Sequence, residues 1–324
     1  MRPLALTLAA TTSLTLLSSF LLSNMTGVPG PGYANTAPSC GTVLCHGAAV
    51  GVPGGNNIAV SIAPTARSLT LGQAISVTTS VTGGATGPGN PGGFNSFISR
   101  GRFTVGTGTA VGFSGTDITH TDSTRRSWTY GYTASTTITG LVNMWAACNT
   151  GDGDLLAGPG DIWAFHNFDS TSTTSTPVRL YVNAARVRPF GSSCVGSYGQ
   201  YPVFGAPQQP NLGSATFSFE LNGAAPSAPM ALLIGANPSW VPLDLTFINI
   251  TGCTLWVDPT VSISLATGAG DAKRAEGTAS IPLPIPSSGG LSGAKLQAQI
   301  AIIDFANGRG VPVTMTNALE LTLQ

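Results

Sequence analysis

Short runs in which apolar and polar residues alternate constrain the fold of this chain more than any other feature. Residues 58–62 form one such run, and residues 127–132, with three aromatic side chains at alternate positions, form another. Alternation places every second side chain on the same face of a strand, so each run predicts a strand with one buried face. Turns rich in Gly and Pro, such as residues 83–93, separate the runs. The sequence therefore predicts an all-β fold built from antiparallel sheets.

The alternating runs fall into two blocks separated by an irregular segment. The first block closes with a predicted strand at residues 178–187, and residues 188–210 are then rich in Gly, Pro, Ser and Tyr. Thr216–Leu221 begins the second block. Short strands joined by turns at regular intervals are typical of sandwiches. We therefore predict two consecutive antiparallel β-sandwich domains, at residues 26–188 and 189–324, after a signal peptide at residues 1–25.

The N-terminus has the pattern of an export signal. Met1 and Arg2 precede an apolar run of Leu, Ala, Thr and Ser that extends to about residue 22. A membrane anchor is the alternative, but Thr and Ser dilute the run and the next basic residue is Arg67. We expect a protein that is secreted, at the cell surface or in the periplasm of a bacterium, with no transmembrane segment after signal removal.

Charged residues are scarce, and this limits the possible functions. Thirteen basic and thirteen acidic residues cancel and make up only 8% of the chain. Nucleic acid is therefore not an expected partner, because its binding needs a basic surface. No Gly-x-Ser-x-Gly motif occurs, and three histidines leave little material for a catalytic triad. We predict that the protein is not an enzyme.

Two cysteines followed directly by a histidine form the most specific chemical motif. In Cys40-Gly-Thr-Val-Leu-Cys45-His46 the thiols could bond the vinyl groups of a c-type haem, with His46 as an axial iron ligand. The usual spacing has two residues between the cysteines, and here there are four. A Cys40–Cys45 disulfide loop and a zinc site are the alternatives. Haem c is the predicted cofactor, and it would need a redox partner that the sequence does not identify.

The second axial ligand of that iron is predicted to be His120, within Ile118-Thr-His-Thr121. His166 and Met144 are less favoured alternatives, since Met can also ligate haem iron. Phe94, Phe97 and Trp128 are expected to supply an apolar wall. Separately, Asp152, Asp154 and Asp161 lie in a Gly-rich stretch where carboxylates could bind Ca²⁺, although an ordinary turn explains the same composition.

Two of the remaining cysteines are predicted to pair. Cys194 and Cys253 both lie in the second block, each next to or near a glycine, and an exported protein folds in an oxidising compartment. Cys148 has no assigned role. The function is therefore either extracytoplasmic electron transfer by a haem-carrying sandwich or a structural or adhesive role for a surface protein stabilised by disulfides.

Two resemblances to known families support export. Thr26–Gly30 before the Cys/His motif, Ile118–Thr121, Ser127–Tyr130 and Gly151–Gly153 resemble marks of the Reeler-like (choice-of-anchor V type) bacterial extracellular domain. That resemblance implies an exported β-sandwich at about residues 26–169. Residues from about 189 to the end resemble a C-terminal β domain of planctomycete-type secreted proteins, which implies surface location and structure only. The marks are Gly191–Gly196, Pro242–Leu245, Gly252–Leu255 and Pro282–Pro284.

Overall fold

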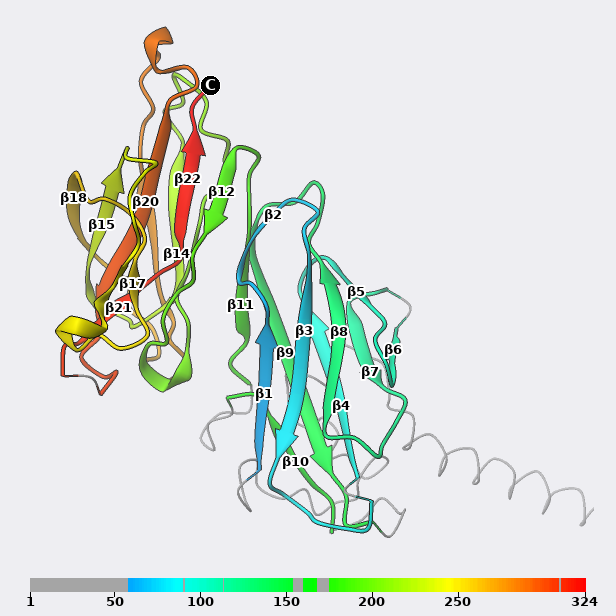
Figure 1. The fold of residues 1–324 in the computed structure, drawn as a ribbon. Coiled ribbons are helices and arrows are strands. Elements are labelled where there is room, and N and C mark those ends of the chain that lie inside the picture. The colour runs from blue at the N-terminus through cyan, green and yellow to red at the C-terminus, as the bar shows by residue number, and fades with distance from the viewer. Residues whose placement is uncertain (1–57, 90, 113, 154–159, 168–174, 309) are drawn as a thin grey trace, which may run out of the picture. The chain divides into compact units, whose positions relative to one another are not determined.

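The computed structural model describes residues 58–324, except 90, 113, 154–159, 168–174 and 309 (Figure 1). By their internal contacts the described residues form two compact units. The first contains residues 58–64, 76–132 and 144–177, and the second contains residues 65–75, 133–143 and 178–324. The predicted boundary between Arg188 and Pro189 stays a prediction. Among the described residues, no helix has the length and apolar character needed to cross a membrane.

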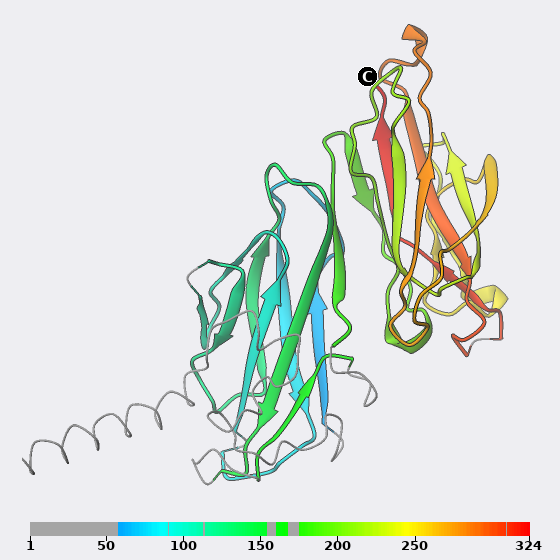
Figure 2. The same ribbon diagram turned by 180° about the vertical axis from the view of Figure 1, so that it is seen from behind.

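The described part is all-β, as the alternating runs predicted. A four-stranded sheet has the order β1-β3-β8-β5, and a second sheet has the order β2-β11-β9-β4-β7-β6, with β10 paired to β9 (Figures 1 and 2). Their bounds are β1 (Ala59–Pro64), β2 (Ser68–Thr70), β3 (Ala74–Thr82), β4 (Gly92–Ile98), β5 (Arg102–Thr104), β6 (Thr109–Val111), β7 (Asp117–His120), β8 (Ser127–Thr133), β9 (Gly140–Thr150), β10 (Ile162–Phe165) and β11 (Val178–Asn183).

The later strands form a second sandwich. One sheet has the order β12-β22-β20-β15-β18, with β21 paired to β20, and it faces the three-stranded sheet β13-β14-β19 (Figure 1). A two-stranded pair joins β16 and β17. The bounds are β12 (Val187–Phe190), η4 (Ser197–Gly199), β13 (Val203–Gly205), β14 (Ser218–Ala224), β15 (Pro229–Gly235), β16 (Leu243–Asp244), η5 (Leu245–Ile248), β17 (Thr254–Leu255), β18 (Val261–Ala266), β19 (Gly277–Pro282), η6 (Gly289–Leu291), β20 (Lys295–Ile303), β21 (Val313–Met315) and β22 (Ala318–Thr322).

The alternation that predicts strands also builds the first core. In β8 the side chains of Trp128, Tyr130 and Tyr132 are buried, whereas the residues between them are more exposed. Phe94 of β4 stacks on Tyr130 with 5.5 Å between ring centroids, which joins the two sheets face to face. The Tyr130 hydroxyl hydrogen-bonds with Thr79, at 2.7 Å. Such a bond is needed because an unpaired buried hydroxyl would be costly.

Two details differ from the strands predicted from the sequence. Strand β2 runs parallel to β11, with Val182 opposite Leu69. The predicted strand at residues 178–187 is two strands, because the backbone turns between Asn183 and Val187. The N–H of Val187 donates to the carbonyl of Ala184, and Arg186 adopts a left-handed φ of 66°. Strand β12 then pairs with β22.

Asn183 holds the backbone at this turn. Its side chain is fully buried, and its amide nitrogen donates to the Leu69 carbonyl and to the Ser68 hydroxyl, each at 2.9 Å. Its amide oxygen accepts from the N–H of Ala206 at 3.0 Å. Nearby, a Cβ at Gly205 would lie 1.9 Å from Cδ1 of Tyr181, so the ring occupies the space that any side chain there would need.

Glu320 links three neighbouring strands of the second sandwich. Its carboxylate lies 3.2 Å from Arg188 of β12 and 3.3 Å from Lys295 of β20. Burial raises the pKa of Glu320, but the hydrogen bonds and charges of Arg188 and Lys295 together outweigh burial, so the net shift is a lowering. The Glu320 carboxylate therefore remains ionised at pH values somewhat below the ordinary pKa range of glutamate.

Candidate functional site

Of the four predicted haem-binding residues, the structure describes one. Cys40, Cys45 and His46 lie outside the described residues, so their pairing and ligation stay predictions. His120 is the last residue of β7 and is 6% exposed. It lies on the inner face of its sheet, at the edge of the first core.

The imidazole of His120 is held by backbone and aromatic neighbours. Nδ1 lies 3.1 Å from both the nitrogen and the carbonyl oxygen of Phe94. The ring centroid is 6.4 Å from that of Phe94 and 6.1 Å from that of Trp128. A backbone contact at Nδ1 fixes the ring orientation, as it does for many metal-binding histidines. The same contacts equally suit a histidine that only completes a core.

Gly93 lies against the opposite edge of the ring. A Cβ at this position would be 2.5 Å from Cε1 and 2.8 Å from Nε2 of His120, and 2.4 Å from Oδ1 of Asn149. Only glycine therefore allows β4 to approach the imidazole this closely. Ligation of an iron by Nε2 of His120 stays a prediction.

The other predicted haem-site residues are dispersed. Phe97 stacks on Trp145 at 5.7 Å and lies on the opposite face of β4 from Phe94. Met144 is fully buried opposite Ile98, which is about 13 Å along β4 from Phe94 at about 3.3 Å per residue. His166 follows β10, where its Nδ1 lies 3.0 Å from the Val60 carbonyl oxygen. The candidate axial ligands thus occupy separate places in the sheet.

The calcium hypothesis receives no support from the part of the chain that the structure describes. Asp152 and Asp161 belong to the described residues, and Asp154 lies outside them. No group of three or more His, Cys, Asp or Glu side chains gathers in a metal-binding arrangement within residues 58–324 apart from the gaps given above.

Cys194 and Cys253 form a disulfide in the second sandwich, which is the pairing that the sequence analysis expects. Their Cα atoms are 4.9 Å apart. Both cysteines are buried in a cluster with Leu245, Ile250 and Met315, and the N–H of Cys194 donates to the Met315 carbonyl. The disulfide therefore ties the segment before η4 to the segment that carries η5 and β17. Cys148 is buried in β9, opposite Phe94.

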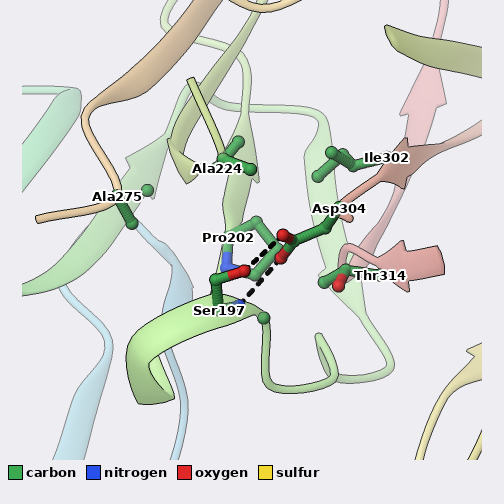
Figure 3. A pocket seen from close by; sticks show the side chains of 10 residues that line it. Ser197, Pro202, Ala224, Ala275, Ile302, Asp304 and Thr314 are labelled. Carbon is green, nitrogen blue, oxygen red and sulfur yellow. Dashed lines mark hydrogen bonds between the residues drawn. The ribbon is translucent and has the colours of Figure 1, made fainter. Parts of the chain in front are cut away.

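The second sandwich contains a hollow that the sequence did not predict. It is lined by η4, the turn between β14 and β15, and the end of β20. Asp304 follows β20, and its carboxylate accepts from the N–H of Ser197 at 2.8 Å and from the Ser197 hydroxyl. Figure 3 shows the two side chains pointing toward one another, with Thr314 beside Asp304. We call the larger space outside Asp304, with a volume of about 210 Å³, the Asp304 hollow.

Two aromatic side chains stand at the Asp304 hollow. Tyr198 of η4 is 53% exposed and Phe305, next to Asp304 in sequence, is 77% exposed. A hollow with a carboxylate inside and aromatic rings outside can bind a cationic or amphipathic group. The sequence signal was weak: Asp304-Phe305 ends an apolar strand and Ser197-Tyr198 lies in a Gly/Ser segment, and nothing in the spacing indicates that they meet.

Comparisons with known proteins find likenesses among solved structures alone. No family model matches the chain, and no curated protein matches it. The Reelin-N domain of F-spondin is 15% identical, with a TM-score of 0.23, and the match covers 34% of this chain and 85% of that domain. The Yersinia pseudotuberculosis adhesin InvE is 12% identical, with a TM-score of 0.21, over 82% of this chain and 58% of that protein. None of these likenesses is close enough to assign a function, and both resemblances drawn from the sequence stay predictions.

Proposed function

We propose that this protein is an exported, non-catalytic β-sandwich protein that serves as a structural or adhesive module at the bacterial cell surface. The observation that carries the proposal is the buried Cys194–Cys253 disulfide. Disulfides form and persist in oxidising compartments and are rare in the cytosol. The export-signal pattern of residues 1–25 is consistent with that compartment.

Exposed apolar side chains in the second sandwich support a binding role. Val241 and Phe247 lie in the segment around η5, and they are 77% and 69% exposed. Phe305 and Tyr198 stand at the Asp304 hollow. Single exposed apolar side chains are ordinary on protein surfaces, but a contiguous group of them indicates an interaction surface. The low charge content of the chain is consistent with association through apolar contacts.

Export and disulfide formation can be tested together. The full chain is expressed with its own N-terminus in a Gram-negative host. Intact cells are treated with protease and are then fractionated. We expect the protein outside the cytoplasm, with Cys194 and Cys253 protected from alkylation until a reductant is added. The same chain lacking residues 1–25 is the control and should stay cytosolic with both thiols reduced. Cytosolic full-length protein with two alkylatable thiols would contradict the proposal.

Electron transfer by a covalent haem is the second candidate. It is supported by the Cys40–His46 motif and by the contact of His120 Nδ1 with Phe94, which would orient the ring as a ligand. The visible spectrum of protein expressed with haem-attachment machinery tests it. A Soret band that survives denaturation, and that Cys45→Ser abolishes, would favour this candidate. A colourless protein would exclude covalent haem and leave the structural role.

A further inference from the structure

Asp304 is a buried carboxylate whose two bonding partners are both neutral. It is 2% exposed, and its oxygens accept from the N–H and the hydroxyl of Ser197. Asp122, Glu276 and Glu320 form ion pairs with basic side chains, and Asp304 has no part in those pairs. Withdrawing a carboxylate from water costs free energy that a cation usually offsets. The described side chains thus leave the negative charge of Asp304 without a positive counterpart.

Thr314 provides a second polar group in the same place. It is 1% exposed, and its Oγ1 has no hydrogen-bond partner among the residues that the structure describes. Thr314 and Asp304 both line a narrow recess of about 10 Å³, which is room for one water-sized group. Arg179 lies beside Gly223 in the recess wall, but its guanidinium donates to the Arg274 carbonyl at 3.1 Å. The recess therefore brings a buried carboxylate and a buried hydroxyl together.

The Asp304 hollow adjoins this recess and gives it an apolar approach. The two spaces share Ser197, Ala225 and Asp304 in their linings. Pro226 and Ala228 contribute apolar surface to the outer part, and Tyr198 and Phe305 stand exposed there. A ligand that fits both spaces has an aliphatic stem and a compact cationic end. Aromatic rings near the path of a cation add further attraction.

We propose that the Asp304 hollow receives a lysine side chain of a partner protein, with its ammonium group on Asp304 and Thr314. The inference rests on the proposed adhesive function and names the chemistry of its partner. Lysine fits better than arginine because its ammonium is a compact point charge, whereas the planar guanidinium is too wide for a recess of one water. The aliphatic stem of lysine lies along the apolar wall.

The test uses the intact mature chain and defined probes. Nα-acetyl-lysine methylamide is titrated against ¹⁵N-labelled protein, and the amide signals of Ser197 and Phe305 are followed by NMR. We expect saturable shifts at both amides. The uncharged Nα-acetyl-norleucine methylamide should bind with an affinity lower by a factor of about ten or more, because it lacks the charge-assisted bonds to Asp304. The arginine analogue should also bind more weakly than the lysine probe.

Variants separate binding from folding. Asp304→Asn should abolish the difference between the lysine and norleucine probes, and Thr314→Val, which keeps the side-chain shape, should weaken the lysine probe alone. Phe305→Ala removes an exposed ring at the hollow and should weaken binding without loss of fold. The matched control is Val105→Ala, which removes a similarly exposed apolar side chain of the first unit and should leave binding of the lysine probe unchanged.

The outcomes distinguish this inference from the proposed function. Equal shifts by the lysine and norleucine probes, or no shifts in a folded protein, would overturn the lysine site, and Asp304 would then serve only to tie η4 to the end of β20. Equal binding of the arginine probe would overturn the choice of lysine. If the protein is exported and disulfide-bonded but binds none of the three probes, the lysine site is refuted and the proposed function is not. If the protein is cytosolic and reduced but binds the lysine probe, the proposed function is refuted and the lysine site is not.

Discussion

Loss of the Cys194–Cys253 cross-link should destabilise the second unit by about 4 kcal/mol. The two cysteines are 59 residues apart, and closing a loop of that length restricts the unfolded chain by about this amount at 25 °C on the chain-entropy model. Reduction leaves both sulfur atoms in the cluster with Leu245 and Met315, so it isolates the effect of the cross-link. For a unit of this size the melting midpoint should fall by roughly 10 °C.

The paired variant C194A/C253A should lose more than reduction does. Truncation also removes the buried sulfur atoms, and the N–H of Met315 loses its acceptor, Cys194 Sγ, at 3.1 Å. The additional loss should be about 1–3 kcal/mol. The variant leaves Cys40 and Cys45 unchanged, so any effect of reducing them is absent when the untreated variant is compared with the oxidised wild type.

The assay must resolve the two units, because one unfolding transition cannot be assumed for a chain of this organisation. Pulsed hydrogen exchange in increasing urea, read by mass spectrometry, follows peptides of β20 and β22 separately from peptides of β4 and β7, which lie in the first unit. The reduced protein should lose protection at lower urea in the first pair of strands, while the second pair serves as an internal control. Coincident midpoints for β20 and β22 with and without reductant would refute the entropy reasoning.

Three further substitutions test individual contacts. Glu320→Gln should cost about 0.5–1 kcal/mol at pH 7, since its basic partners are 60% and 53% exposed and screened by water. Because the folded pKa of this carboxyl is lowered, its stabilisation is fully present above the ordinary value of 4.5. It is lost as the pH falls through the lowered pKa, so urea titrations of wild type and variant should converge in acid. Asn183→Ala should cost about 3 kcal/mol by leaving two buried backbone groups unpaired, and an unchanged urea midpoint would disprove that accounting. Gly205→Ala should cost about 1–3 kcal/mol, because the methyl group meets the ring of Tyr181; the companion change Tyr181→Leu should recover part of the loss in a double-mutant cycle.

The strands of the first core were predictable because their signal is local. In β3 and β8 the buried side chains lie at alternate positions, as the residue pattern indicated. Strand β18 shows the limit of that reasoning. Its alternating run Val261-Ser-Ile-Ser-Leu265 resembles a half-buried strand, yet Val261 is 50% exposed and Ile263 36%. It is the edge strand of its sheet, and edge position depends on sheet order rather than on local sequence.

The candidate site was predictable only in part for a similar reason. The histidine motif pointed to His120, but the motif could not show that Gly93 packs against Nε2 or that Phe97 lies on the opposite face of β4 from Phe94. Both facts depend on the register between β4 and its neighbours. The Asp304 hollow joins two segments more than one hundred residues apart, and neither segment has a motif of its own.

The sequence by itself determined the all-β class, the low charge and the cysteines available for pairing. These follow from residue type and short-range periodicity, since alternate side chains of a strand must lie on opposite faces. The tertiary structure alone decided that β2 runs parallel to β11, that the predicted strand at 178–187 divides at Arg186, and that Ser197 meets Asp304. Each of these depends on which distant strands share a sheet, and the free energy of that choice is distributed over the whole core rather than carried by any local pattern.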